Sequence, residues 1–576
     1  AAAGTGGISS TGTITLTADE GITLDDSISS AGGTINLVAD SNPGGGDNGV
    51  FTVNDQLSSG GGAGTIIITA DDITVTDNII SGNVTVNVSD GGNLDLGDAA
   101  AGGGMAIDQD ELRQFSVTTL TLNASGSTLT VDNLAATDTQ NINNLALTAS
   151  NVIFQTANST FNSLTVTATT ALTVNDNITL STVNSGQDND LTLITGELIL
   201  GVGASLDSGT AAITIQVSGG GTIGLGDADG NLRIENSKLG NLVAGSLTID
   251  AQEQDITVNN VTGAATVGDV TLLGRSIIFD GVSSSFVSIT ATATRVNSGV
   301  NTGDGDITVD VDVTANNGAV NFTATNDINF SPVTIFADSN ASGSITLTST
   351  NGNITGVGAA APGASNAALA GLGAGQLSDG DYQYLVTFIN GSGSETENGA
   401  VTPITVVDNL VNGQVDLFNI PLGTTGVTAR RIYRTQADGT TFNLLTTIND
   451  NTGTTFADDT PDTTIVNAAE PPNINSFVAM TLNADNGVNI NSNVTITSAQ
   501  NFIFDADIDN NGTGTFTLAN NAAINSTGAS LTLTAADINI DDGRMDLGAG
   551  SLNLLVAQAG RTIGIGDGVT GQGFIL

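Results

Sequence analysis

The runs ITLTA at residues 14–18, INLVA at 35–39, IIITA at 66–70 and VTVNV at 84–88 decide the fold class of this chain. They alternate aliphatic residues with Thr, Asn or Ser, which is the period-two pattern of a strand with one buried face. The runs start 21, 31 and 18 residues apart, with Gly, Asn and Asp between them. A parallel β-solenoid requires one turn of roughly 18 to 30 residues that holds two or three strands. Similar runs continue to residue 356 and resume near residue 477, so the sequence predicts an all-β solenoid.

A longer block occurs three times: LDLGDAAAGGGMAI from residue 94, IGLGDADGNLRI from residue 223 and IGIGDGVTGQGFI from residue 563. From Met105 in the first copy and Leu232 in the second, the apolar positions match without a shift. Copies at this separation indicate a modular, repetitive protein. The third copy stops at Leu576 within the pattern, which predicts that the natural chain continues and that the solenoid has no cap there. We therefore expect either a longer fibre protein or copies that stack end to end.

The composition excludes several classes of function. Ten basic residues against 58 acidic ones give a net charge of −48, which argues against binding to nucleic acid or to an anionic membrane. The chain has no Cys, His or Trp. It therefore has no disulfides, no thiolate or imidazole metal site and no Ser-His-Asp triad. No apolar run of about 18 residues is present, so no membrane-spanning helix is expected.

Residues 357–473 differ in composition from the rest of the chain. They contain six of the eight prolines and all three tyrosines. The stretch opens with the small-residue segment AAAPGASNAALAGLGAG and closes with AAEPPNIN. These segments are typical of hinges around an inserted domain. Between these two segments, the runs YQYLVTFIN, AVTPITVV and ARRIYRT predict antiparallel strands of a small β-sandwich. The expected organisation is a solenoid over 1–356, an inserted sandwich over 357–473 and a continued solenoid over 474–576.

The insert contains the main candidates for partner contact. Arg430, Arg431 and Arg434 form the one basic cluster of the chain. On a strand, Arg430 and Arg434 share one face with Ile432, while Arg431 lies on the other. The cluster either binds an acidic partner, such as the solenoid of a neighbouring molecule, or forms a solvated face with local ion pairs. Two further candidates for partner contact are Tyr382 and Tyr384.

Acidic clusters are the candidate metal sites, because carboxylate oxygens are ligands that Ca²⁺ prefers. The alternative is that acidic turn residues cap strands and keep the protein soluble. No cluster matches an EF-hand loop or the nonapeptide calcium repeat. Ca²⁺ is therefore a candidate cofactor rather than an assigned one. The clusters considered are Asp25 and Asp26; Asp71 and Asp72; Asp304, Asp306, Asp310 and Asp312; Asp458 and Asp459; and Asp505, Asp507 and Asp509.

The strands of ITLTA type and the segment TIGLGD at residues 222–227 resemble those of filamentous-haemagglutinin-like surface adhesins. The resemblance covers residues 1–356 and 474–576. It implies a right-handed parallel β-helix in an extracellular, surface-attached or secreted fibre. In the insert, DGDYQYLVTF, TARRIYRT and TFADDTPD resemble a fibronectin type III or immunoglobulin-like module.

Three functions follow as expectations. The first is a non-enzymatic structural rod of a bacterial surface fibre, filament or sheath, which contacts itself or neighbouring surface proteins. The second is an adhesin stalk whose insert binds a glycan or a protein. The third is a polysaccharide lyase or glycosidase, because parallel β-helices also occur in such enzymes. The third is the least favoured, because paired carboxylates with a nearby basic residue are needed and the basic residues of the solenoid are scattered singly. Those residues are Arg113, Arg233, Lys238, Arg275, Arg295, Arg544 and Arg561.

Overall fold

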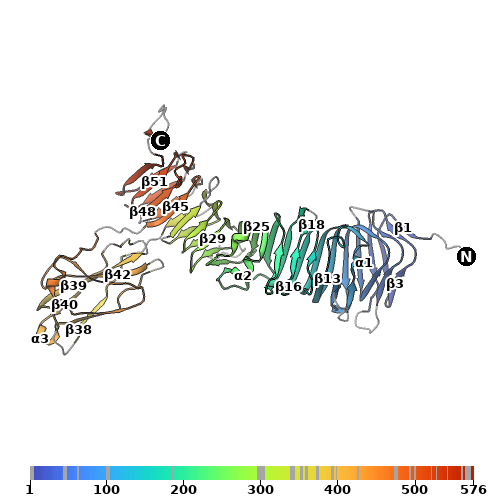
Figure 1. The fold of residues 1–576 in the computed structure, drawn as a ribbon, viewed down its shortest axis with the longest axis horizontal. Coiled ribbons are helices and arrows are strands. Elements are labelled where there is room, and N and C mark those ends of the chain that lie inside the picture. The colour runs from blue at the N-terminus through green and yellow to red at the C-terminus, as the bar shows by residue number, and fades with distance from the viewer. Residues whose placement is uncertain are drawn as a thin grey trace. The chain divides into compact units, whose positions relative to one another are not determined.

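The computed structural model is mainly β and divides into two compact units (Figure 1). Unit 1 comprises residues 1–277 and 285–305, and unit 2 comprises residues 278–284 and 306–576. The structure describes residues 6–42, 49–60, 64–98, 104–184, 186–294, 305–331, 333–337, 344–350, 354–356, 361–370, 375–390, 393, 395–396, 398–423, 427–472, 478–491, 495–498, 501–519, 522–526, 528–540, 543–558, 562–564 and 573–575.

The longest ladder of unit 1 is formed by the alternating runs of the sequence. Its strands are β2 (Ile14–Thr17), β5 (Thr34–Val38), β8 (Thr65–Ala70), β10 (Ile79–Val88), β13 (Phe115–Asp132), β14 (Ile142–Phe154), β16 (Leu164–Val174), β20 (Leu191–Leu200), β22 (Ala212–Val217), β25 (Leu242–Asp250), β27 (Val267–Gly274) and β30 (Ser288–Ala293). Ile14 pairs with Ile35, and Ile35 pairs with Ile66, in parallel register. Ile66 in turn pairs with Val84. The predicted parallel solenoid is therefore confirmed.

Shorter strands of unit 1 form two further sets of parallel strands beside this ladder. One set contains β1 (Ile8–Ser10), β4 (Ile28–Ser30), β7 (Leu57–Ser58), β15 (Ser159–Thr160), β17 (Thr179–Ser181) and β21 (Ser205–Asp207). The other contains β3 (Gly21–Leu24), β6 (Val50–Val53), β9 (Asp72–Val75), β11 (Leu94–Gly97), β12 (Met105–Ile107), β23 (Ile223–Gly226), β24 (Leu232–Ile234) and β26 (Ile256–Asn259). The described part of the unit also contains the short helices α1 (Gln109–Leu112) and α2 (Asn236–Leu239) and the 3₁₀ turns η2 (Ser89–Gly91) and η3 (Ala264–Thr266). β28 (Ile277–Phe279) and β29 (Ser284–Phe286) contain residues of both units.

The recurring block adds an extra strand to a coil. In the first copy β12 pairs in parallel with β11, and in the second β24 pairs in the same way with β23. In the third copy, in unit 2, β55 (Thr562–Gly564) pairs with β56 (Gly573–Ile575). The two coils of unit 1 with a block are long: Val84 pairs with Leu120, 36 residues on, and Ile213 pairs with Leu247, 34 residues on. The block is therefore a structural unit as well as a sequence repeat.

The glycine of the block is required by its backbone geometry. Gly97 and Gly226 have φ angles of 82° and 74°, which L side chains rarely adopt. A Cβ added at Gly226 would lie 2.1 Å from the carbonyl oxygen of Asn259 in the next coil. The aspartate that follows accepts a bond from that coil, since Asp227 Oδ2 lies 2.5 Å from the side-chain nitrogen of Asn260. The GD pair thus connects two coils.

The solenoid of unit 2 also has three parallel ladders. The first contains β31 (Ile307–Val309), β34 (Ile328–Phe330), β37 (Ile354–Gly356), β47 (Thr495–Ser498), β50 (Ala523–Ser526) and β53 (Arg544–Asp546). The second contains β32 (Val313–Ala315), β35 (Val333–Ala337), β45 (Val478–Ala484), β48 (Asn501–Asp505), β51 (Leu531–Ala535) and β54 (Leu552–Val556). The third contains β33 (Val320–Ala324), β36 (Ile345–Ser349), β46 (Val488–Ile490), β49 (Thr515–Leu518) and β52 (Asp537–Ile540).

An antiparallel sandwich is inserted between β37 and β45. One sheet has the order β38 (Asn366–Leu369), β41 (Val415–Phe418), β44 (Thr455–Asp458). The other has the order β40 (Thr402–Val406), β39 (Gly380–Asn390), β42 (Val427–Arg434), β43 (Asn443–Ile448), and the short helices are α3 (Asn409–Asn412) and α4 (Asp462–Ile465). Both sheets contribute to one core, in which Val386 and Ile432 pack with Leu417. The predicted inserted antiparallel β-sandwich is confirmed.

Alternate residues of each strand form the solenoid cores. In β8 the side chains of Ile66 and Ile68 are fully buried, whereas Ile67 is partly exposed. Large aromatic residues occupy the same inward positions, and Phe504 of β48 stacks on Phe516 of β49 with ring centroids 5.9 Å apart. Stacked inward side chains remove apolar area from water in every coil.

Candidate functional site

The aspartates proposed for Ca²⁺ around β31 bond from coil to coil. Each accepts a hydrogen bond from a residue 21 or 22 positions later, which is one coil further along. The bonds are Asp306 Oδ1 from Asp327 N at 3.0 Å, Asp310 Oδ1 from Ser331 Oγ at 2.5 Å and Asp312 Oδ1 from Thr334 N at 2.6 Å. Asp304 lies outside the described residues. Such bonds between coils are those expected of acidic turn residues that cap strands, and metal binding by the same side chains stays a prediction.

The second group, Asp505, Asp507 and Asp509, forms a tight turn after β48. Asp507 is fully buried and accepts bonds from the backbone of Gly512 at 2.9 Å and of Asn511 at 3.2 Å. Burial, with a hydrogen bond to Asp509, raises the pKa of Asp507 to about 6. The fold thus favours the protonated form, and the resulting stabilisation is present at low pH and is lost as the pH rises through about 6. Within the described parts of the chain, no group of three or more acidic side chains could hold a metal ion.

The basic cluster of the insert lies in its interior. Arg430, Arg434, Tyr382 and Tyr384 are fully buried. Arg434 forms ion pairs with Asp458 at 2.5 Å and with Asp462 at 2.9 Å. The prediction that these four side chains contact a partner is therefore wrong for this structure. They share the strand face that packs into the sandwich, and carboxylates of the same domain satisfy the charges.

Arg431 lies on the opposite face and is about one-third exposed. It pairs with Glu395, which also accepts a hydrogen bond from Tyr433 Oη at 2.6 Å. Each arginine in the described parts of the chain has such a carboxylate partner: Arg113 with Asp110 and Asp138, Arg233 with Asp229 and Glu235, Arg275 with Asp255, Arg430 with Asp450, and Arg544 with Asp546. The local ion pairs that were the alternative for this cluster are present.

The three tyrosines should titrate abnormally. Burial and the neighbouring Asp462 raise the pKa of Tyr382 to about 12. Burial with Asp458 raises the pKa of Tyr384 further, and burial with a hydrogen bond to Glu395 raises the pKa of Tyr433. A raised phenol pKa stabilises the fold fully below the ordinary value of about 10, and this stabilisation is lost as the pH rises through the folded value. We expect the ultraviolet absorbance of tyrosinate to stay low in the folded protein at pH 10–11, where the urea-unfolded chain ionises. Ionisation of the folded protein near pH 10 would contradict this placement.

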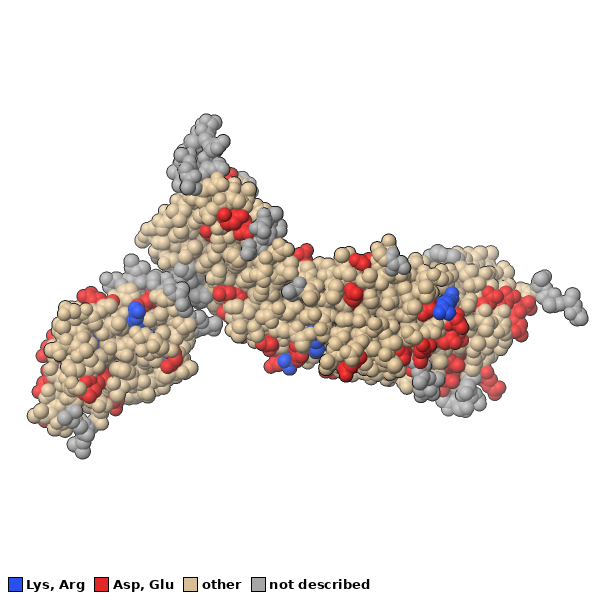
Figure 2. Space-filling model, in the orientation of Figure 1, with Lys and Arg blue, Asp and Glu red and all other residues tan. Residues whose placement is uncertain are grey.

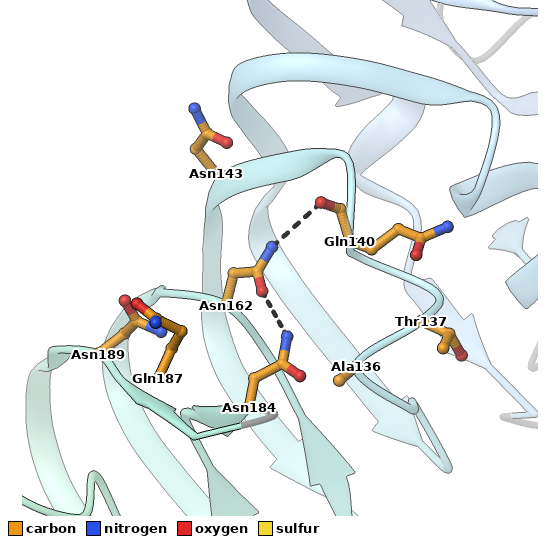
Figure 3. Close-up of a pocket in the computed structure, with 8 residues that line it drawn as sticks. All are labelled: Ala136, Thr137, Gln140, Asn143, Asn162, Asn184, Gln187 and Asn189. Atoms are coloured by element: carbon orange, nitrogen blue, oxygen red, sulfur yellow. Dashed lines mark hydrogen bonds between the residues drawn. The ribbon is translucent and has the colours of Figure 1, made fainter.

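A pocket lined by amide side chains lies on unit 1 (Figure 3). Its volume is about 490 Å³. The residues come from turns of three successive coils: Ala136, Thr137, Gln140, Asn143, Asn162, Asn184, Gln187 and Asn189. Asn184 and Gln187 belong to a short hairpin, and Asn189 follows it. In this hairpin β18 (Val183–Asn184) pairs antiparallel with β19 (Gln187–Asp188), in contrast to the parallel ladders around it. Gly186, with φ 84°, allows its tight turn.

Asn162 is held in the centre of this pocket (Figure 3). Its Nδ2 donates to the backbone oxygens of Thr139 and Ile142, both at 3.1 Å. Its Oδ1 accepts from Asn184 Nδ2 at 2.6 Å. In Figure 3, Gln187 and Asn189 lie on one side of Asn162, and Gln140 lies on the other. The pocket thus has a fixed amide floor with further amides around it.

The amino-acid sequence alone does not predict this pocket. The available signal was the density of amides in two turns, QNINN at 140–144 and NSGQDN at 184–189. Turns throughout the chain are rich in Asn, so this signal does not distinguish a pocket from an ordinary strand connection.

Acidic side chains are spread over the face of the molecule drawn in Figure 2, where basic side chains occur at a few separate points. No helix in the described ranges is long and apolar enough to cross a membrane. Compared with protein-family models, with curated proteins and with solved structures, the chain matches none.

Proposed function

We propose that this chain is a non-enzymatic structural protein, a β-solenoid that forms part of an extracellular bacterial fibre, filament or sheath. The observation that carries the proposal is the continuity of the ladders across the insert. Ile354 pairs directly with Ile496, and Val333 pairs directly with Met480, although the sandwich lies between them in sequence. Stacked coils provide an extended scaffold, and the sandwich is attached as a lateral contact domain.

The resemblance to filamentous-haemagglutinin-like surface proteins supports this function and an extracellular location. The degenerate coils rich in Gly, Asn and Thr agree with this resemblance. The two-sheet insert agrees with our proposal that it is a fibronectin type III or immunoglobulin-like module. The charges disfavour contact with polyanions, and contact between like molecules requires cations or apolar groups between the two surfaces. Because the described arginines are paired internally, carboxylates dominate the charge available to partners, and like-charged surfaces repel unless cations or apolar contacts intervene.

The proposal is tested by electron microscopy of the native material and of the purified full chain, with and without EDTA. We expect ordered fibres with a regular axial repeat. Loss of order after chelation would indicate that divalent ions such as Ca²⁺ bridge acidic surfaces. Isolated particles at all concentrations, unchanged by chelation, would contradict the self-assembling scaffold.

The second candidate is an adhesin stalk whose insert binds a protein or glycan of another surface. It is favoured by two large apolar side chains near the end of β40: Val407, directly after β40, is 75% exposed, and Leu410, in α3, is 80% exposed. Exposed apolar groups that lie together on a soluble domain mark interaction sites more often than isolated ones do. If the double substitution Val407→Ser and Leu410→Ser reduces attachment to a target surface and leaves fibre formation unchanged, the adhesin function is supported.

A further inference from the structure

We propose that the amide-lined pocket of unit 1 binds an uncharged carbohydrate. The proposal goes beyond the scaffold function and does not depend on it. It rests on the side chains that line the pocket, on their hydrogen-bonding state and on the charges around them.

Four lining side chains are available for a ligand. Gln140, Asn143, Gln187 and Asn189 lie on the pocket wall, and their side-chain amides form no hydrogen bond in the described structure. Asn162, in contrast, uses both ends of its amide within the protein. The pocket therefore combines a fixed floor with unpaired donors and acceptors at its rim.

The chemistry of these groups fits sugar hydroxyls. A primary amide has two N–H donors and a carbonyl acceptor, and a hydroxyl both donates and accepts, so adjacent hydroxyls can pair with one amide. A pocket of about 490 Å³ lies within the range of small-molecule sites. Successive coils lie about 4.8 Å apart, so amides from three coils offer contacts along a short oligosaccharide.

The surrounding charges select a neutral sugar over an acidic one. Among the described residues, those that line the pocket carry no charged side chain. The neighbouring Asp188 and Asp190 are directed to the next coil, where Asp188 Oδ2 accepts from Thr210 N at 2.8 Å and Asp190 Oδ1 accepts from Ala212 N at 3.1 Å. Their negative charges, close to the pocket and without a lining cation, disfavour a carboxylate or sulfate on the ligand.

The experiment measures binding of three neutral trisaccharides, maltotriose, cellotriose and mannotriose, to the full chain by calorimetry and by saturation-transfer NMR. Trigalacturonic acid is the acidic counterpart. We expect at least one neutral trisaccharide to bind at millimolar concentration or below, and the acidic one to bind at least tenfold more weakly. The double substitution Gln140→Ala and Gln187→Ala should weaken binding about tenfold, since two hydrogen-bonding groups are removed.

Asn141→Ala is the matched control, because Asn141 is exposed in the same turn as Gln140 but does not line the pocket. It should bind as the unmodified protein does. Neither change removes an internal side-chain hydrogen bond, and unchanged thermal unfolding of both variants checks that the coils are intact. The proposal is overturned if no neutral trisaccharide binds, if trigalacturonic acid binds as tightly, or if the double variant retains full affinity.

Discussion

Replacing Gly226 with alanine is expected to destabilise the coils around β23 and β26 by about 2–5 kcal/mol. The residue has a φ angle of 74°, and a Cβ there would lie 2.1 Å from the Asn259 carbonyl oxygen, so the ladder must separate locally. Solenoids open locally rather than in one step, so the measurement is amide hydrogen exchange of residues 223–226 and 256–259 in the full chain. Gly97→Ala should have the same effect on its own coil.

Gly220→Ala is the control for this prediction. Gly220 also has a positive φ angle, 78°, but a Cβ there meets no atom within 4 Å. The dihedral penalty alone is about 1 kcal/mol, so exchange near β23 should rise only slightly. Equal effects of the two substitutions would show that the close approach between coils does not matter.

The second large effect is expected in the insert. Asp458→Asn leaves the buried Arg434 with one carboxylate partner instead of two. In the unmodified chain Tyr384 Oη donates to Asp458 Oδ2 at 2.7 Å, and the substitution removes this anionic acceptor. Breaking a buried ion pair costs about 3–5 kcal/mol because a buried charge remains uncompensated. The chain has no Trp, and its three tyrosines all lie in the insert, so tyrosine fluorescence reports unfolding of the insert alone. We expect the denaturant midpoint of that signal to fall sharply.

Glu470→Gln provides the matched control, since it removes one negative charge at an exposed position of the same insert. Its midpoint should stay close to that of the unmodified chain. A comparable fall in both variants would attribute the effect to net charge, and an unchanged midpoint for Asp458→Asn would show that the ion pair contributes little.

The ladders could be predicted from the sequence because their signal is local. Runs such as 14–18 and 35–39 alternate with period two, and the return of such a run in each coil places Ile14 beside Ile35. The extra strand β12 could not be predicted, because three residues carry no periodicity and its pairing with β11 depends on the loop between them. Helix α1 has a local sequence signal, because Asp108 and Glu111 form a capping box at its start.

The candidate site was harder to predict, because alternation defines two strand faces without showing which one is buried. Ile432 shares a face with Arg430 and Arg434, and this apolar neighbour was the signal that the arginines point inward. Their burial also requires Asp450, Asp458 and Asp462, which come from later parts of the insert. Such long-range charge pairing leaves no pattern in a single stretch of sequence.

The direct pairing of Ile354 with Ile496 has a mechanical consequence. Tension applied along the solenoid passes through the hydrogen bonds between β37 and β47. The sandwich is therefore outside the load path and keeps its fold while the coils are strained. A protease cut within it breaks the chain but leaves the neighbouring coils bonded to each other.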